Sequence, residues 1–110
     1  MKLVFFDMDG VLTPKPHPIF LAEIAGRKEL FERAFEESRM REIGLEDAVE
    51  RVVTVLAGTS ASVLEEAGKR LPIMAGAVQT VRELKRAGYH PILVTNGFEQ
   101  VAGVFASRLG

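Results

Sequence analysis

The stretch of sequence that decides the fold is Leu3-Val4-Phe5-Phe6-Asp7-Met8-Asp9-Gly10-Val11-Leu12-Thr13. Its first four residues form a short apolar run that ends abruptly at two aspartates and a glycine. Such a run is typical of a strand that is buried on both faces of a parallel sheet. Ligands of an open parallel sheet bind beyond the carboxyl ends of its strands. The two aspartates therefore lie where we expect a functional site.

A second strand is predicted at residues 90–94 (HPILV), and Thr95-Asn96-Gly97 follows it directly. An amphipathic helix precedes this strand over residues 76–87, with Gly88 as its carboxyl-terminal cap. A final helix is predicted over residues 98–109. A strand, a helix and a second strand in this order indicate a parallel pair. If the strands are neighbours, Asp7 and Thr95 face one pocket.

Between these elements, apolar residues recur at helical spacing from about residue 19 to residue 69, with no strand pattern among them. Ser62 and Glu65 resemble a capping box that opens the fourth helix of this block. The three prolines at positions 14, 16 and 18 are expected to exclude a helix there. We therefore predict an α/β core made of residues 1–15 and 75–110, and a helical cap made of residues 16–74.

Composition excludes several classes of protein. The 110 residues carry a net charge of −1 and include no cysteine, so disulfide, thiolate-zinc and cysteine-nucleophile chemistry are excluded. No basic patch indicates nucleic acid as a partner. The apolar stretches fall far short of the roughly 20 residues that span a membrane. We expect a cytoplasmic protein with neither nucleic acid nor membrane as a partner.

Asp7 and Asp9 indicate a particular chemistry. Two close carboxylates repel each other, and a site that keeps both ionised usually supplies a cation, for which Mg²⁺ is the natural candidate. One carboxylate can attack phosphorus and the other can transfer protons. Thr95 offers a hydroxyl beside backbone amides at a helix start, which suits a phosphoryl group. The simpler alternative is that Asp-x-Asp-Gly is an ordinary turn.

The two motifs together resemble a known family. Residues 5–13 are similar to the first motif of the haloacid dehalogenase superfamily, and Ile92-Leu93-Val94-Thr95-Asn96-Gly97-Phe98 is similar to its second. The helical insertion occupies the cap position of the subgroup that contains phosphoserine phosphatase. The resemblance implies an α/β fold with an incomplete Rossmann-like parallel sheet and an inserted helical cap.

The resemblance also implies roles for individual residues. Asp7 would be the nucleophile and a magnesium ligand. Asp9 would be the general acid and base, with its backbone carbonyl on the metal. Thr95 would bind a phosphoryl oxygen, and Asn96 and Gly97 would shape that pocket. The implied substrate is a small phosphorylated molecule.

This sequence departs from the family pattern in three ways. The lysine of the third motif and the acidic residues of the fourth have no counterpart, since Lys69 and Lys85 precede the second strand. The first strand would have an open apolar edge. We therefore expect that the chain forms a homo-oligomer or that a complementing C-terminal half pairs with it. Pro16 and Val52 occupy the positions that grip the amino acid in phosphoserine phosphatase, which argues against that specificity.

The sequence thus predicts a Mg²⁺-dependent phosphomonoester hydrolase that works through an aspartyl-phosphate. The alternative is a non-catalytic half domain that binds phosphate or a partner. A mutase or other phosphotransferase would share every residue named above. His17 and His90 have no visible partner in the sequence and are interpreted as structural or solvent-exposed.

Overall fold

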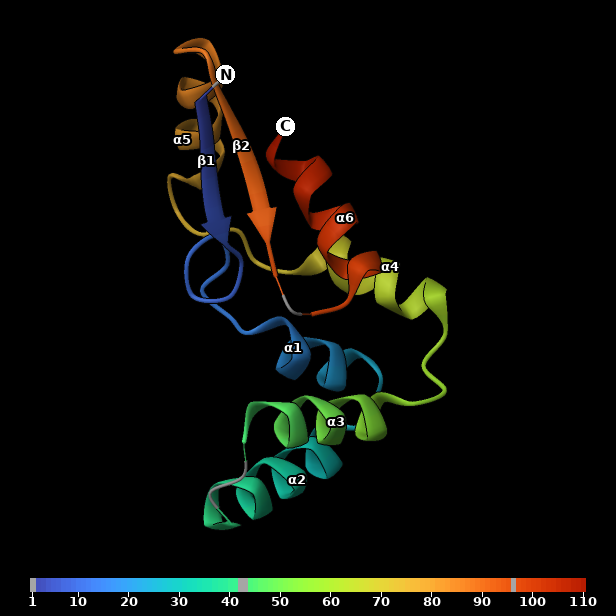
Figure 1. The fold of residues 1–110 in the computed structure, drawn as a ribbon. Coiled ribbons are helices and arrows are strands. Elements are labelled where there is room, and N and C mark those ends of the chain that lie inside the picture. The colour runs from blue at the N-terminus through green and yellow to red at the C-terminus, as the bar shows by residue number, and fades with distance from the viewer. Residues whose placement is uncertain (1, 42–43, 96) are drawn as a thin grey trace.

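The computed structural model describes residues 2–41, 44–95 and 97–110, and it is elongated, measuring 45 × 29 × 21 Å (Figure 1). Over these ranges two strands and six helices follow one another along the chain. They are β1 (Lys2–Asp7), α1 (His17–Ile24), α2 (Lys28–Arg41), α3 (Leu45–Leu56), α4 (Ala61–Arg70), α5 (Ala77–Arg86), β2 (Tyr89–Val94) and α6 (Glu99–Leu109).

β1 and β2 form the parallel pair that the sequence predicted. Their register runs from Lys2 opposite Tyr89 to Asp7 opposite Val94, so both strands end at the same edge of the sheet. Gly88, with a φ of +89°, ends α5 and turns the chain into β2, as expected of a carboxyl-terminal cap. The register brings Asp7 and Thr95 to one end of the sheet.

The prediction that the first strand is buried on both faces was wrong, and the second strand is not buried either. Phe5 is 64% exposed and Leu3 is 47% exposed, and no residue of either strand belongs to the buried class. Phe6 and Leu93, by contrast, are partly buried against the core. Among the described residues, β1 pairs with β2 alone, so its other edge is open. The open apolar edge expected from the sequence is therefore confirmed.

The helical region begins earlier than predicted. α1 starts at His17, with Pro16 as its N-cap and Pro18 in its first turn. The expectation that the prolines exclude a helix was wrong for Pro18, because a first-turn residue has no intrahelical partner for its backbone N–H, and proline lacks that group at no cost. The ring also fixes φ near the helical value.

The start of α4 was also predicted two residues too late. Ser60 is the N-cap, and its hydroxyl oxygen accepts a hydrogen bond from the backbone N–H of Val63 at 3.4 Å. Ser62 lies inside the first turn, with its hydroxyl 3.0 Å from that of Ser60. Two serines spaced two apart both satisfy the pattern of a capping residue, so the sequence pattern alone did not separate them.

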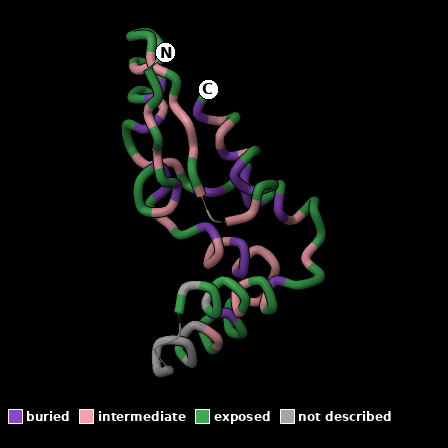
Figure 2. Tube along the Cα trace, viewed as in Figure 1, coloured by how far each residue is buried: buried purple, intermediate pink, exposed green. Residues whose placement is uncertain are grey.

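The core lies beyond the carboxyl ends of the strands and beside them, where buried residues from separate elements gather (Figure 2). Met8 and Leu12 of the loop after β1 enter this core, together with Leu21 of α1 and Phe105 of α6. The loop that carries the two aspartates is therefore anchored by buried apolar side chains on the side away from solvent.

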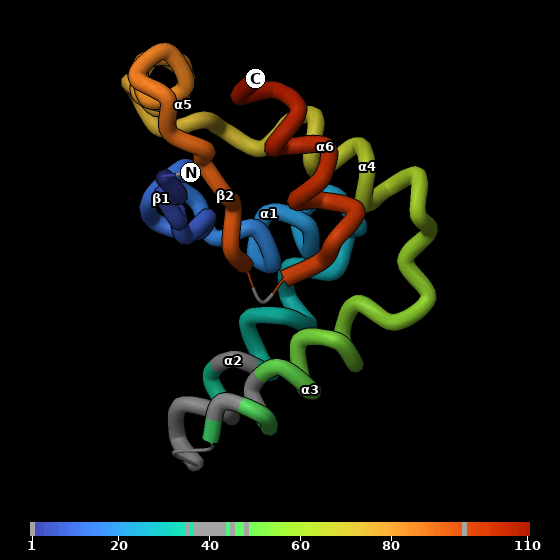
Figure 3. The backbone as a smooth tube through the Cα atoms, turned by 45° about the horizontal axis from the view of Figure 1, so that its top comes forward, coloured from blue at the N-terminus to red at the C-terminus, as the bar shows by residue number. Residues whose placement is uncertain are grey.

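α4 and α6 pack most closely of all the helices, and Figure 3 shows them side by side. A Cβ added to Gly68 would lie 2.8 Å from the backbone oxygen of Val101, so the helices touch where α4 has no side chain. Arg108 of α6 donates hydrogen bonds to the carbonyls of Gly68 and Leu71 at 2.8 and 2.7 Å. These contacts hold α6 along the end of α4.

α2 and α3 pack against each other at the end of the molecule away from the sheet (Figure 1). Arg27, just before α2, donates hydrogen bonds to the carbonyls of Val55 and Ala57 at the end of α3, at 3.0 and 2.5 Å. Among the described residues, no helix has both the length and the apolar character needed to cross a membrane.

Candidate active site

The loop after β1 is a tight turn closed on its own backbone. The carbonyl of Met8 accepts hydrogen bonds from the N–H groups of Leu12 and Thr13 at 3.0 and 3.1 Å. Gly10 has a φ of +80°, which favours glycine, and its N–H donates to the carbonyl of Thr13 at 2.8 Å. With Met8 fully buried, the aspartates on either side of it are presented toward the surface.

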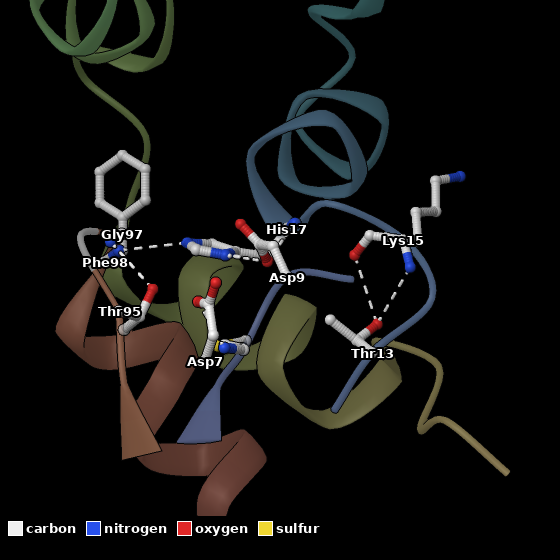
Figure 4. A network of polar contacts seen from close by, with 9 residues as sticks. Asp7, Asp9, Thr13, Lys15, His17, Thr95, Gly97 and Phe98 are labelled. Carbon is white, nitrogen blue, oxygen red and sulfur yellow. Dashed lines mark hydrogen bonds and ion pairs between the residues drawn. The ribbon is translucent and has the colours of Figure 1, made fainter. Parts of the chain in front are cut away.

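Asp7 is exposed at the carboxyl end of β1. Its Oδ1 accepts a hydrogen bond from the N–H of Met8 at 2.8 Å, which orients the carboxylate. No other hydrogen bond to this carboxylate comes from the described residues, so Oδ2 is free to meet a ligand. Figure 4 shows the carboxylate pointing into the space between Thr95 and the Asp9–His17 pair.

Thr95 and Gly97 form the opposite wall of this space. The hydroxyl oxygen of Thr95 accepts a hydrogen bond from the N–H of Gly97 at 3.1 Å, so its own proton can be donated to a ligand. Phe98 is the N-cap of α6, and no side chain of a described residue caps that helix end. Helix starts favour anions. Asn96, the remaining predicted phosphate-binding residue, lies outside the described residues.

His17 also belongs to this site, although the sequence interpretation gave it no partner. Its Nδ1 lies 2.8 Å from Oδ1 of Asp9, and its backbone N–H donates to the same oxygen at 3.1 Å. Its Nε2 accepts a hydrogen bond from the N–H of Phe98 at 3.3 Å. The ring is only 1% exposed. His17 therefore joins the aspartate loop to the start of α6.

Gly97 fits this arrangement because it has no side chain. A Cβ at this position would lie 1.7 Å from Nε2 of His17 and 1.9 Å from its Cε1, well inside van der Waals contact. The predicted role of Gly97 in shaping the phosphate pocket remains a prediction. The structure adds that this glycine makes room for the imidazole ring.

Lys15 does not supply the positive charge that the family pattern places near the phosphoryl group. Its Nζ lies 2.7 Å from Oε2 of Glu23, and Figure 4 shows its side chain directed away from Asp7. The hydrogen bond from Lys15 holds the pKa of the Glu23 carboxyl below its ordinary value. Lys15 is therefore engaged in an ion pair beside α1.

The described residues supply part of a magnesium site. Asp7 offers a carboxylate oxygen and Asp9 a backbone carbonyl oxygen, and Mg²⁺ prefers oxygen ligands and is often held by one or two carboxylates together with water and phosphate. No group of three or more histidine or acidic side chains able to hold a metal ion occurs within the part of the chain that the structure describes. The residues present fit a magnesium ion that takes its remaining ligands from elsewhere.

A separate hollow of about 490 Å³ lies along α5. It is lined by Met74 and by residues of α5 that include Arg82 and Arg86. None of the described site residues at the strand ends lines it. Since it contains neither aspartate nor Thr95, the candidate site rests on the two loops at the strand ends.

The sequence pattern of the haloacid dehalogenase-like hydrolases matches residues 1–110. The chain belongs to this family. This haloacid dehalogenase-like chain is 34% identical over 109 residues to a phosphoserine phosphatase of Archaeoglobus fulgidus, covering 99% of the chain and 32% of the relative. It is 28% identical to a phosphoserine phosphatase of Methanocaldococcus jannaschii, covering 99% of the chain and 52% of the relative.

Solved structures of the family share its fold. A substrate-bound phosphoserine phosphatase superimposes with a TM-score of 0.79 at 27% identity, over 98% of this chain and 51% of that one. The predicted haloacid dehalogenase-type α/β fold is therefore confirmed. The chain spans about half, or less, of the length of these relatives.

Proposed function

We propose that this chain carries the nucleophile and acid–base half of a Mg²⁺-dependent phosphomonoester hydrolase. The observation that carries the proposal is the placement of Asp7. Its carboxylate is exposed at the end of β1, opposite the last residue of β2, and it faces the Thr95 hydroxyl across one space. Asp9, two residues on, is only partly exposed and hydrogen-bonded. This arrangement suits an attacking carboxylate beside a separate proton donor.

The proposed reaction uses these residues in the following order. Oδ2 of Asp7 attacks phosphorus, the bond between phosphorus and the leaving oxygen breaks, and Asp9 donates its proton to that oxygen. The product alcohol leaves an aspartyl-phosphate on Asp7. Asp9 then takes a proton from water as the water attacks the aspartyl-phosphate, which releases phosphate and restores Asp7. Thr95 donates its hydroxyl proton to a phosphoryl oxygen throughout.

Magnesium, held by the Asp7 carboxylate and the Asp9 backbone carbonyl, would neutralise the charge of the phosphoryl group and of the attacking carboxylate. The lysine and the further acidic ligand of the family pattern would come from a complementing C-terminal half. The relatives are about two to three times longer than this chain, as their coverage of 32% and 52% shows, which leaves room for such a half.

The proposed substrate is a small phosphorylated molecule, a class to which the substrate named for the relatives belongs. Phosphoserine itself is not favoured. Pro16, at one of the two positions that grip the amino acid in that enzyme, is the N-cap of α1 and offers no charge. Val52, at the other, is a partly buried apolar residue packed against the core.

The test is magnesium-dependent release of phosphate from an aryl phosphate. Asp7→Asn removes the nucleophile and is expected to abolish release. Asp47→Asn makes the same chemical change at an exposed position in the first turn of α3 and is expected to leave the rate unchanged. Phosphate release that persists in Asp7→Asn would contradict the proposal.

A second candidate is a non-catalytic half domain that binds phosphate or a partner. The absence of a third metal-binding side chain among the described residues favours it. The second candidate would be supported if the chain releases no phosphate but binds inorganic phosphate, and if this binding weakens in Thr95→Val. A mutase or other phosphotransferase would use the same residues, with a second acceptor in place of water.

A further inference from the structure

The contacts of His17 fix which of its nitrogens carries the proton. A backbone N–H can only donate, so the contact from Phe98 requires a lone pair on Nε2. A neutral imidazole with a lone pair on Nε2 carries its proton on Nδ1. That proton points to Oδ1 of Asp9, which lies 2.8 Å away. The ring is thus held as the neutral Nδ1–H form.

The same contacts make the two oxygens of Asp9 different. Oδ1 accepts two hydrogen bonds, one from Nδ1–H of His17 and one from the backbone N–H of that residue. Two donors already point at Oδ1, so a proton carried by this carboxyl group binds at Oδ2. Asp9 is 30% exposed, so Oδ2 can meet a ligand, whereas the His17 side chain is 1% exposed.

Packing prevents the imidazole from turning. The ring meets Phe98 edge to face, with centroids 6.5 Å apart and planes at 82°. It also lies where Gly97 has no Cβ, so the turn after β2 closes directly over it. The position of Asp9 is therefore tied through one rigid ring to the turn that carries Thr95.

We propose that His17 is a positioning residue for Asp9. It directs Oδ2, the proton-bearing oxygen, toward the leaving oxygen of the substrate, and it sets the distance between Asp9 and the turn at the start of α6. This inference rests on the proposed function, since it names the residue that orients the proposed acid and base. His17 itself touches neither substrate nor reacting atoms in this arrangement.

The first test is spectroscopic and needs no turnover. Long-range ¹H–¹⁵N correlation of the imidazole ring distinguishes Nδ1–H from Nε2–H directly. We expect a single Nδ1–H tautomer for His17 and averaged tautomers for His90, which is exposed on β2. In His17→Asn, whose amide nitrogen replaces Nδ1, the Phe98 amide resonance should shift. An Nε2–H tautomer or an averaged ring at His17 would overturn the inference, whatever the activity of the chain.

The second test is kinetic and separates proton donation from folding. Phenyl phosphate needs a proton on its leaving oxygen, whereas 2,4-dinitrophenyl phosphate hardly does. A positioned general acid contributes about 10²- to 10⁴-fold to such a step. His17→Gln keeps an acceptor for Phe98 but loses the donor to Asp9. We expect kcat for phenyl phosphate to fall at least about tenfold, within the range that a general acid supplies, with KM and the dinitrophenyl rate nearly unchanged.

Matched variants make the result decisive. His17→Asn keeps a donor to Asp9 and should recover most of the phenyl phosphate rate, and Asp9→Asn should show the full dependence on the leaving group. Equal losses for both substrates in His17→Gln, or no loss, would overturn the role of His17. If Asp7→Asn does not lower phosphate release, the proposed function fails, and the tautomer measurement still decides the geometry of His17.

Discussion

At the scale of single residues, the two aspartates of one loop have different environments. Asp7 is exposed and accepts one backbone N–H, while Asp9 is partly buried and accepts two hydrogen bonds on one oxygen. Two identical side chains can take two catalytic roles when their surroundings differ. The structure thus separates an accessible carboxylate from a fixed one within three residues.

Gly97→Ala is expected to disturb the site through His17. The new Cβ would lie 1.7 Å from Nε2, and the buried ring cannot retreat without losing its contacts to Asp9 or Phe98. Overpacking of this kind costs about 1–3 kcal/mol in free energy of unfolding. Urea unfolding monitored by circular dichroism measures the loss.

A double-mutant cycle shows whether the imidazole causes that loss. In a His17→Ala background the ring is absent, so the Gly97→Ala substitution should cost little more than the His17→Ala change alone. The expected result is strong non-additivity between the two positions. Additive losses would show that the alanine disturbs something other than His17.

The sequence predicted part of this site and missed part of it, for physical reasons. Asp7, Asp9 and Thr95 follow apolar strands directly, and parallel strands end at one edge, so their proximity could be derived. His17 could not be derived in this way. Its second partner, Phe98, is 81 residues away, and only the packing of α6 beside the aspartate loop brings the two together.

At the scale of helices, the seam between α4 and α6 places the start of α6 at the site. α4 falls within residues 16–74, the predicted cap, yet it packs on α6 of the predicted core. The division into core and cap remains a prediction.

Gly68→Ala should weaken this seam. Its Cβ would lie 2.8 Å from the backbone oxygen of Val101 and 2.8 Å from Cβ of Val104, so the helices must move apart. The gain in helix propensity from glycine to alanine is about 1 kcal/mol, while overpacking costs about 1–3 kcal/mol, so the net change is expected to be destabilising. Denaturant unfolding measures the difference in free energy.

Gly103→Ala provides the matched comparison. Gly103 is exposed in the interior of α6, and a Cβ there would meet nothing within 4 Å. The same substitution should therefore stabilise the chain by roughly 0.5–1 kcal/mol through propensity alone. If both variants shift the unfolding midpoint in the same direction by similar amounts, the close approach at Gly68 does not limit the packing of α4 on α6.

At the scale of the whole molecule, the apolar core is buried among the helices, but one face of the sheet is exposed. Apolar runs as continuous as those of β1 and β2 are typical of strands covered on both faces, which is why the sequence predicted burial. The described residues cover only part of this sheet. In parallel strands, paired residues share a face, so Phe5 stands with Ile92 and Leu3 with His90 on one face. Val94, opposite Asp7, lies there too and is 51% exposed.

This uncovered face predicts concentration-dependent association of the 110-residue chain. Phe5 is 64% exposed, and burying a phenylalanine side chain contributes about 1.5–3 kcal/mol. Phe5→Lys should therefore weaken association by at least about tenfold, since each 1.4 kcal/mol is a factor of ten in the dissociation constant. Leu30→Lys makes a similar change at a 52% exposed position on α2, away from the sheet, and should leave association unchanged. Sedimentation velocity across a dilution series measures the dissociation constant of the wild-type chain and of each variant. Equal weakening by both variants would show that the chains associate through another surface. If the wild-type chain stays monomeric at every concentration, the prediction of self-association is wrong, and a complementing C-terminal half remains the expected partner of this face.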